Sequence, residues 1–462
     1  MKKTIFILLF IYHSLLQAQS IGVGTNSPDS SAILDVQSNS KGLLIPRLTT
    51  AQRKAIANPQ PGLLVFDTDK RTVFMFENNQ WSHLTFNKSD QVPPTAYNAS
   101  DGAGGDQLGY AVGMSGDYAV ASAPYDDIGS NTDQGSIYIY HKVNNNWIEE
   151  TKLTASDGAA NDHFGLSLAM AGDFIVVGSP DNDYSGMANR GAVYVFQRVG
   201  TGWIQHARIG ASDGAANDQF GRSVSFEGDN LLIGSPQDDI GANADQGSAY
   251  LYARSGNSWS LTKKFTASDG AADDEFGSSV SISGVFVCIG APKDDANGTD
   301  DGSAYIYWGV SIPAWAQIQK LVLPVSNTLG LGARVYLDGT KAYLSYNINF
   351  AGSYLRLFER GNFGIWNDAG SSAVSSYAHL YFKGDFIIRG TDYYTGTFTN
   401  QGYVTIYQKS GNTSTFLRTI MDEFPSESAF FGSGVALEGY NAIIGARGKG
   451  NNRGQVQFIQ FE

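Results

Sequence analysis

Residues 219–265 read QFGRSVSFEGDNLLIGSPQDDIGANADQGSAYLYARSGNSWSLTKKF, and their pattern decides the fold. Short apolar or alternating runs are separated by Gly, Asp, Asn and Pro, which are the signals of strands and tight turns. The runs predict strands over 222–226, 231–234, 249–252 and 259–265. Four short antiparallel strands in one unit are typical of a blade of a β-propeller.

The same unit recurs along the chain with a fixed spacing. The motif Ala-Ser-Asp-Gly, a tryptophan and a proline each reappear every 56 residues. A period of this size identifies a repeat architecture. The motif begins at Ala99, Ala155, Ala211 and Ala267, the tryptophans are Trp147, Trp203, Trp259 and Trp315, and the prolines are Pro124, Pro180, Pro236 and Pro292.

A glycine in the first turn marks every unit, including the diverged units of the second half. Its occurrences are Gly116, Gly172, Gly228, Gly284, Gly339, Gly384 and Gly439. The last unit stops after its third strand, and residues 91–98 supply the missing fourth strand. This pairing would close the array and remove its open edges. The sequence therefore predicts an all-β protein, with a seven-bladed β-propeller of four-stranded antiparallel blades over residues 85–462. An open solenoid is the alternative.

Composition excludes several classes of protein. Charged residues are 16% and hydrophobic residues 42%, so the chain has enough apolar surface to fold and is not a disordered protein. The net charge of −13 repels phosphate backbones, which argues against a nucleic-acid partner. A single cysteine excludes an internal disulfide framework.

Residues 1–18 have the pattern of a secretory signal peptide. Lys2 and Lys3 precede an apolar run, and a small-residue site ends at Ala18. The apolar run is shorter than a bilayer span requires, although an uncleaved anchor helix is the alternative. We therefore expect cleavage after Ala18 and a secreted or cell-surface protein with no transmembrane segment in the mature chain.

The repeats resemble a known family. Phe164-Gly165 followed by Val177-Gly178-Ser179-Pro180 is similar to an FG-GAP repeat, the blade of the integrin α-subunit propeller and of many bacterial secreted proteins. The resemblance implies a propeller and a role in cell adhesion or binding. Integrin-like repeats carry a calcium loop between their first and second strands. Here that connection is a tight turn such as Gly172-Asp173, so the family's metal site does not carry over.

Residues 19–84 form a separate small module. The stretches GLLIPRLTTAQRKAI and PGLLVFDTD resemble a segment found at the start of many bacterial exported and phage tail-fibre-like proteins. Thr49, Thr50 and Gln52 predict the start of a short helix, and residues 62–67 and 72–77 predict a strand pair. Because so short a segment buries little core, we expect it to need a partner surface or self-association.

Carboxylates form the most informative cluster of potential ligands. In a four-stranded blade, the loops between strands two and three emerge on the same face as the loops that lead to the next blade. Clustered carboxylates suit Ca²⁺, which takes six to eight oxygen ligands, whereas the alternative is that each Asp stabilises its own turn. The candidate ligands of calcium, the one candidate cofactor, are Asp126, Asp127, Asp133, Asp238, Asp239, Asp245, Asp294, Asp295, Asp300 and Asp301.

Other chemically interesting residues favour structural roles. The six histidines show no ligand spacing, and His163 is expected to be a solvated loop residue. Cys288 aligns with apolar residues of a second strand and is interpreted as a buried filler. The repeated tryptophans and tyrosines suit packing between blades, with a sugar-stacking surface as the alternative.

These observations predict an exported binding or adhesion protein that presents a propeller face to an extracellular glycan, protein or surface. Catalytic motifs are missing from the sequence, so we do not expect an enzyme. The first alternative is a secreted polysaccharide-active enzyme that uses two carboxylates of that face. The second is a structural component of a surface appendage, with oligomerisation through residues 19–84.

Overall fold

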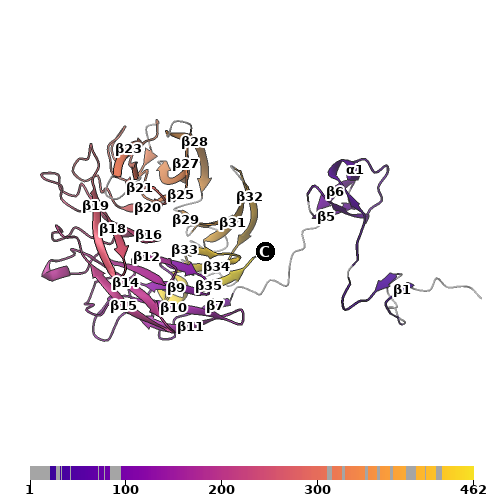
Figure 1. The fold of residues 1–462 in the computed structure, drawn as a ribbon, viewed down its shortest axis with the longest axis horizontal. Helices are drawn as coiled ribbons and strands as arrows, with labels where there is room; N and C mark the ends of the chain where they lie inside the picture. The colour runs from indigo at the N-terminus through magenta and orange to yellow at the C-terminus, as the bar shows by residue number, and fades with distance from the viewer. Residues whose placement is uncertain are drawn as a thin grey trace, which may run out of the picture. The chain divides into compact units, whose positions relative to one another are not determined.

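The structure is a computed structural model that divides into two compact units between Ser89 and Asp90 (Figure 1). The signal peptide predicted at residues 1–18 lies outside the described residues. None of the helices in the described ranges has the length and apolar character needed to cross a membrane. The described ranges are 21–83 except 26, 28–31, 33, 42, 71 and 78; 95–309; and 315–461 except 325–327, 349–351, 362–364, 375–377, 385, 392–401, 411–412 and 423–428.

The first unit contains a strand pair and a small mixed sheet. β1 (Ile21–Val23) pairs in parallel with β2 (Leu34–Val36). The predicted strands at 62–67 and 72–77 are confirmed as part of the mixed sheet, in which the first two strands are parallel. Its order is β3 (Arg47–Leu48), β4 (Leu64–Asp67), β5 (Thr72–Glu77) and β6 (Gln80–His83).

The predicted short helix is α1 (Thr50–Lys54). The Thr49 hydroxyl accepts the Gln52 backbone N–H at 3.2 Å, and the Gln52 side chain accepts the Thr49 N–H at 2.9 Å. This reciprocal cap satisfies two amides that the first helical turn leaves without partners.

A buried ion pair connects α1 to the mixed sheet. Arg53 of α1 lies 2.9 Å from Asp67 of β4, and both are almost completely buried. The Arg53 guanidinium also lies 3.7 Å from the ring centroid of Phe74. Burial opposes the charge of Asp67, but Arg53 and nearby hydrogen bonds outweigh it and lower the pKa of Asp67 to about 2.

Among the described residues, the second unit holds seven antiparallel sheets, numbered here in chain order. Short helices lie at Tyr184–Gly186 (η1) and Lys449–Asn452 (α2). Sheets 1 to 4 have four strands each: sheet 1 contains β8 (Val112–Ser115), β9 (Tyr118–Ala123), β10 (Ser136–Val143) and β11 (Asn146–Leu153); sheet 2 contains β12 (Ser167–Ala171), β13 (Phe174–Ser179), β14 (Ala192–Val199) and β15 (Gly202–Ile209); sheet 3 contains β16 (Ser223–Glu227), β17 (Asn230–Ser235), β18 (Ser248–Ser255) and β19 (Ser258–Phe265); and sheet 4 contains β20 (Ser279–Ser283), β21 (Phe286–Ala291), β22 (Ser303–Gly309) and β23 (Trp315–Leu321).

Sheet 5 contains β24 (Thr328–Leu329), β25 (Val335–Asp338), β26 (Lys341–Ile348), β27 (Gly352–Arg360) and β28 (Trp366–Val374), and sheet 6 contains β29 (Ala378–Lys383), β30 (Phe386–Thr391), β31 (Tyr403–Ser410) and β32 (Thr413–Ile420). Sheet 7 contains β33 (Phe431–Glu438), β34 (Asn441–Ala446), β35 (Val456–Gln460) and β7 (Thr95–Tyr97).

The sheets follow one another around a common centre. We call β8, β12, β16, β20, β25, β29 and β33 the inner strands. Each inner strand contacts the inner strand of the next sheet, and β33 contacts β8. In Figure 1, the labelled inner strands lie toward the middle of the unit, and β15, β19, β23, β28 and β32 lie toward its outside. This arrangement of antiparallel sheets is that of a β-propeller.

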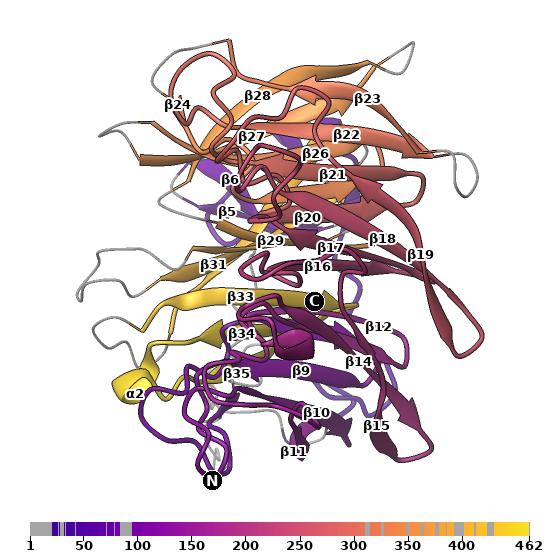
Figure 2. The ribbon, with the colours of Figure 1, turned by 90° about the vertical axis from the view of Figure 1, so that its left-hand side faces the viewer.

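Sheet 7 takes its outermost strand from the start of the unit. β7 pairs with β35, where Tyr97 opposes Val456 and Thr95 opposes Phe458. The predicted pairing of residues 91–98 with the final strand is therefore confirmed for 95–97. Sheet 7 also lies against sheet 1, as Figure 2 shows for β34 and β35 beside β9.

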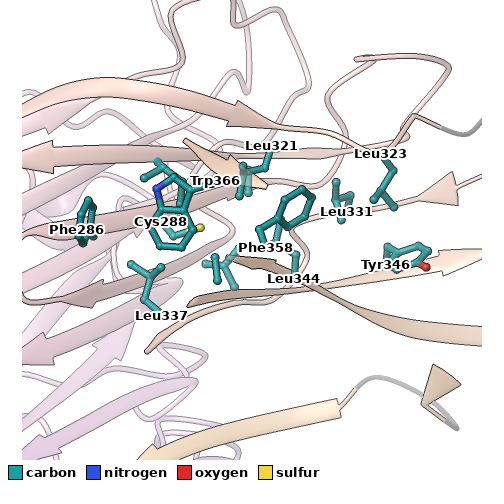
Figure 3. Packing of buried hydrophobic residues seen from close by; sticks show 14 residues of the cluster. Phe286, Cys288, Leu321, Leu323, Leu331, Leu337, Leu344, Tyr346, Phe358 and Trp366 are labelled. Atoms are coloured by element: carbon teal, nitrogen blue, oxygen red, sulfur yellow. The ribbon is translucent and has the colours of Figure 1, made fainter. Parts of the chain in front are cut away.

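The hydrophobic core lies between neighbouring sheets. The cluster between sheets 4 and 5 includes Cys288, Phe286 and Trp366 (Figure 3). A corresponding cluster joins every other neighbouring pair, including sheets 7 and 1, where Trp147 stacks on Phe458 at 4.4 Å. Cys288 is 0% exposed, which confirms its interpretation as a buried filler, and burial raises the pKa of its thiol.

The repeated aromatic residues also belong to this core. Trp147 and Trp203 are buried, and Trp259 and Trp315 pack against buried clusters. The paired tyrosines of the third strands are equally covered, so packing between blades is confirmed over a sugar-stacking surface. The buried tyrosines are Tyr138, Tyr140, Tyr250, Tyr252, Tyr305 and Tyr307.

Candidate functional site

Two families of loops gather at one face of the second unit, which we call the loop face. The first family connects the outer strand of one sheet to the inner strand of the next, and the second connects strands two and three of each sheet. Inner strands begin at this face, and the second strands end there because they run antiparallel to them. The acidic loops therefore lie together on the loop face.

The second-to-third-strand loops of sheets 1–4 and 7 are bonded to the following sheet. Between sheets 3 and 4, the Phe276 N–H donates to the Gln246 carbonyl at 2.9 Å, and the Glu275 N–H donates to the Asp245 carbonyl at 3.1 Å. A Cβ at Gly247, which has a φ of +83°, would lie 2.1 Å from the Phe276 carbonyl oxygen. Glycine permits this close approach of two backbones.

A repeated polar cluster connects the loops between sheets to the sheets themselves. In sheet 3, the Lys264 Nζ lies 2.7 Å from the carboxylates of both Asp213 and Asp238. The Tyr250 hydroxyl lies within hydrogen-bond distance of the same two groups, at 3.0 and 2.8 Å. Burial opposes the charge of Lys264, but the two carboxylates outweigh it and raise its pKa. We call this arrangement the lysine cluster.

Sheets 1 and 4 repeat the lysine cluster, and sheet 2 changes it. In sheet 2, Arg208 lies 2.6 Å from Asp157 and donates to the Asn182 side chain at 2.7 Å. The counterparts in sheet 1 are Asp101, Asp126, Tyr138 and Lys152, and those in sheet 4 are Asp269, Asp294, Tyr305 and Lys320.

The ten predicted calcium ligands take part, through side chain or backbone, in contacts within their own loops and sheets. Three of them, Asp126, Asp238 and Asp294, are the buried members of the lysine clusters. A further six close turns, because the carboxylate of each first residue accepts the backbone N–H of the second at 2.8, 3.0 and 2.8 Å in Asp127–Asp133, Asp239–Asp245 and Asp295–Asp300. The tenth, Asp301, is 5% exposed, and its buried Oδ2 has no hydrogen-bond partner among the described residues.

These contacts support the turn role of the aspartates directly. Asp133, Asp245 and Asp300 have φ values of 52°, 50° and 53°, a left-handed conformation that Asp tolerates better than most residues. Within the part of the chain that the structure describes, no three His, Cys, Asp or Glu side chains are grouped as a metal site. Calcium binding by these loops stays a prediction.

Another buried carboxylate recurs just before each Phe-Gly position. The Asp218 side chain accepts the Ala215 backbone N–H at 2.6 Å and is 2% exposed. Burial and the nearby charges of Asp238 and Asp239 raise the pKa of Asp218 to about 6. The pKa values of Asp106, Asp162 and Asp274, its counterparts in sheets 1, 2 and 4, are raised as well, mainly by burial.

A cavity of about 880 Å³ follows the inner strands through the second unit. Residues of all seven sheets line it. A smaller hollow of about 250 Å³ shares Tyr110, Leu166 and Arg222 with the large cavity and also includes Tyr125 and His163. The large cavity has the size of an ordinary small-ligand site.

Sequence reasoning missed the charged residues at the loop-face end of this cavity. Arg222, Arg334 and Arg447 line it and come from sheets 3, 5 and 7. The position of Arg222 holds Leu166 in sheet 2 and Ser278 in sheet 4. Arg222 therefore departs from the repeat at the start of an inner strand, and this departure could have marked it as a candidate site residue.

His163 lies in a loop, as expected, but it is only partly solvated. Its Nδ1 lies 2.8 Å from an Asp181 carboxylate oxygen, and its ring packs edge-on against Tyr125 with centroids 5.0 Å apart. The residue is half-buried because its loop folds over the smaller hollow.

Part of the second unit matches a known family of repeats. Residues 98–140, 147–196, 203–252 and 259–307 match the family described as FG-GAP repeat. The matched segments cover sheets 1–4, where the spacing of 56 residues is strictly kept. Residues 98–307 are therefore FG-GAP repeats, as the resemblance implied.

The chain combines these FG-GAP repeats with a second recognisable region. Residues 22–98 match the family described as the phage tail like trimerisation region. A similar solved structure is the periplasmic gluconolactonase of Pseudomonas aeruginosa, which is 13% identical with a TM-score of 0.47, over 77% of this chain and 93% of that one. A search of curated proteins finds no match to the sequence.

Proposed function

We propose that the protein is an exported binding protein whose propeller presents its loop face to an extracellular glycan or protein. The observation that carries this proposal is the cavity of about 880 Å³, which is lined by all seven sheets and runs along the inner strands that begin at that face. Binding sites in proteins are concave and few, and this cavity has the size they need. The FG-GAP repeats fit such a role because the adhesive integrin α-subunits contain similar blades.

The binding experiment uses the full chain without residues 1–18. It is screened against immobilised acidic and neutral glycans and against extracellular matrix proteins. Saturable binding to one ligand class supports the proposal. An absence of binding to every glycan and protein on the arrays would count against it.

We propose further that the second unit is a closed seven-bladed ring. Its support is the β7–β35 pairing, together with the N–H groups of Gln107 and Leu108, which donate to the Asn452 and Arg453 carbonyls at 2.8 and 2.9 Å. Deletion of residues 95–98 should lower Tm by more than about 10 °C or prevent folding, because it leaves β35 as an unpaired sheet edge. An unchanged Tm would contradict ring closure.

Three copies of the chain are proposed to associate through the first unit. Support comes from the trimerisation-region match and from apolar side chains that a single copy leaves exposed. Exposed apolar residues in such number usually mark an interface. The most exposed are Leu44 at 82%, Leu43 at 67%, Ile21 at 60%, Leu34 at 54% and Val23 at 52%.

Light scattering tests this assembly. We expect three chain masses for the native protein and one for the variant Leu43→Lys/Leu44→Lys, with the propeller still folded. A trimer would raise the avidity for a repetitive surface, because the second and third contacts become intramolecular. A native protein that remains a monomer at micromolar concentration would contradict this part of the proposal.

We propose that the propeller does not catalyse a reaction. Among the carboxylates, Asp218 has a pKa near neutrality, as a general acid requires, but it is 2% exposed and bonded to the Ala215 N–H. Turnover of a polysaccharide that is abolished by a single carboxylate substitution would favour the enzyme alternative instead.

A further inference from the structure

The central cavity has chemically different ends. Its acidic lining residues, Glu227 and Asp338, stand at the final residues of β16 and β25, away from the loop face. Both already have partners, since Glu227 accepts the Gly284 N–H at 2.6 Å and Asp338 lies 2.7 Å from Lys409. Three basic lining residues, Arg222, Arg334 and Arg447, lie at the opposite end, where the inner strands begin. The fourth, Lys383, is the final residue of β29 at the acidic end and lies 3.3 Å from Glu438.

Arg222 and Arg334 differ from five other arginines of the chain. Neither forms a salt bridge with a carboxylate among the described residues. Arg222 is exposed, and Arg334 is half-buried. Other arginines are neutralised by an aspartate: the pairs are Arg53–Asp67, Arg198–Asp173, Arg208–Asp157, Arg254–Asp229 and Arg356–Asp368.

A third cation lies between them. Arg447 lies over the Tyr110 ring, 5.2 Å from its centroid. Its charge and that of Arg334 act on His379, and with burial as the largest cause they hold the pKa of His379 well below its usual value. The charges of Arg222 and Arg447 both act on the Tyr125 phenol. The three guanidinium groups therefore converge on one end of the cavity.

His379 adds a hydrogen-bond donor at the same place. Its Nδ1 lies 3.2 Å from Arg334 Nη1. Because a guanidinium can only donate, Nδ1 accepts and the imidazole proton resides on Nε2. That Nε2–H is buried and has no hydrogen-bond partner in the described part of the protein.

We propose that the loop-face end of the central cavity is a carboxylate-binding site in which Arg222 and Arg334 hold the carboxylate of a small polar ligand. Arg447 adds positive charge, and His379 Nε2–H adds a neutral donor. The proposal rests on the binding role proposed above and specifies the chemistry of its ligand. An acidic sugar and a free organic acid both offer this group.

Several physical arguments favour a carboxylate. The planar fork of a guanidinium matches the two oxygens of a carboxylate, and such charge-assisted pairs are strong hydrogen bonds. Arg222 and Arg334 form no salt bridge among the described residues, so the carboxylate of a ligand would supply the charge partner that these two guanidinium groups lack. Tyr110 and Tyr125 stand beside the arginines with rings 6.3 Å apart and offer apolar faces to the rest of the ligand.

Calorimetric titration of the full chain tests the proposal. The probes are trigalacturonate for the acidic-sugar source, citrate for the free-acid source, and galactose as a neutral sugar. The variants are Arg222→Gln and Arg334→Gln, and the matched control is Arg453→Gln, which removes the same charge from an exposed position outside the cavity lining. Melting curves of each variant check that it is folded.

We expect one of the two acids to bind, and each cavity variant to weaken it by about tenfold or more, while Arg453→Gln changes the affinity by less than about twofold. Preference for trigalacturonate identifies a sugar ligand, and preference for citrate identifies an organic acid. Equal binding of galactose, no binding of either acid, or binding unaffected by Arg222→Gln and Arg334→Gln would overturn the site.

A failure of this carboxylate site can be distinguished from a failure of the proposed binding function. Glycan-array binding that persists in both arginine variants keeps the binding role and rejects this site. Carboxylate binding without any array ligand keeps this site and rejects an extracellular glycan or protein as the partner.

Discussion

Sheet 3 holds its connecting loop with Asp213, Asp238 and Lys264, whereas sheet 2 holds the corresponding loop with Asp157, Asn182 and Arg208. Two acids and one lysine are replaced by one acid, one amide and one arginine, so the net charge of the cluster changes. The contacts between loop and sheet are kept. The comparison indicates that the cluster serves to position the loop, since a function based on negative charge would not survive in sheet 2.

The same comparison explains how the aspartates before the Phe-Gly positions differ. In sheet 2, the Asn182 amide donates to Asp162 at 2.7 Å. In sheet 3, the equivalent neighbour is Asp238, whose negative charge acts on Asp218. The equivalent residues therefore act in opposite ways: Asn182 stabilises the Asp162 carboxylate in sheet 2, whereas Asp238 opposes the ionisation of Asp218 in sheet 3.

Among the changes to these clusters, the largest loss of stability should come from removing the lysine of sheet 3. Lys264→Met leaves Asp213 and Asp238 without their shared partner, and we expect a loss of about 3 kcal/mol in the free energy of unfolding, measured by chemical denaturation. The control is Lys263→Met, which removes the same charge from the adjacent residue, for which the structure shows no salt bridge. Equal losses for the two variants would show that the cluster adds nothing beyond general electrostatics.

A smaller effect is expected from pH. Because the pKa of Asp218 in the folded protein is about 6 and its ordinary value is 3.8, the folded state binds more protons than the unfolded state between these values. Stability from this group therefore falls as pH rises from about 4 to 6, and lowering the pH from 7 to 5 should gain about 1 kcal/mol.

Asp218→Asn should remove that gain, as measured by denaturation of variant and native protein at both pH values. Asp162→Asn in sheet 2 provides the comparison and should change the pH dependence less, because Asn182 already stabilises the Asp162 carboxylate. The same pH dependence in native protein and Asp218→Asn would contradict the raised pKa.

Transplanting the cluster of sheet 2 into sheet 3 should have a still smaller effect. The double variant Asp238→Asn/Lys264→Arg recreates the amide and arginine next to Asp213. We expect it to cost less than about 1 kcal/mol, well below the loss from Lys264→Met, because hydrogen bonds replace those removed. A double variant as unstable as Lys264→Met would mean that the two clusters are not equivalent.

The smallest change should come from calcium. Asp126, Asp238 and Asp294 already have a lysine partner at 2.7 Å, so Ca²⁺ must displace a cation to reach them. We expect about 5 mM Ca²⁺ to shift Tm by less than about 2 °C, in contrast to a loop with free carboxylates. A larger rise that disappears in Asp294→Asn/Asp301→Asn would establish the calcium site that the sequence predicts.

The repeated part of the molecule was largely predictable from sequence. The strands expected at 222–226, 231–234, 249–252 and 259–265 correspond to β16–β19, with boundaries that differ by up to three residues. The fixed period predicts the strands well because the same turn residues and core positions recur in every unit. The repeat pattern predicts less in sheet 5, where Leu331-Gly332 replaces Phe-Gly. There the short strand β24 is a fifth strand, which no other sheet has among the described residues.

The candidate site was hard to predict for the opposite reason. Arg222, Arg334 and Arg447 each occur once, in different repeats, and come together because the sheets are arranged around one centre. Residues that recur in every unit are mostly those that stabilise every unit, so the repeat pattern points to them first. It selected the aspartates of the loop face, whose partners are lysines and backbone amides of the same region.

The pairing of β7 with β35 also has a consequence for the order of folding. Sheets 1–6 are each made from one continuous stretch of chain, whereas sheet 7 must bring Asn98 to Gln455, which are 357 positions apart. Contacts over such separations carry a larger entropy of loop closure and form slowly. Sheet 7 should be the last to assemble, and during synthesis the growing chain keeps an unpaired sheet edge until β35 has been made. The time between the synthesis of β8 and that of β35 is thus the period in which this protein is most exposed to aggregation through its edges.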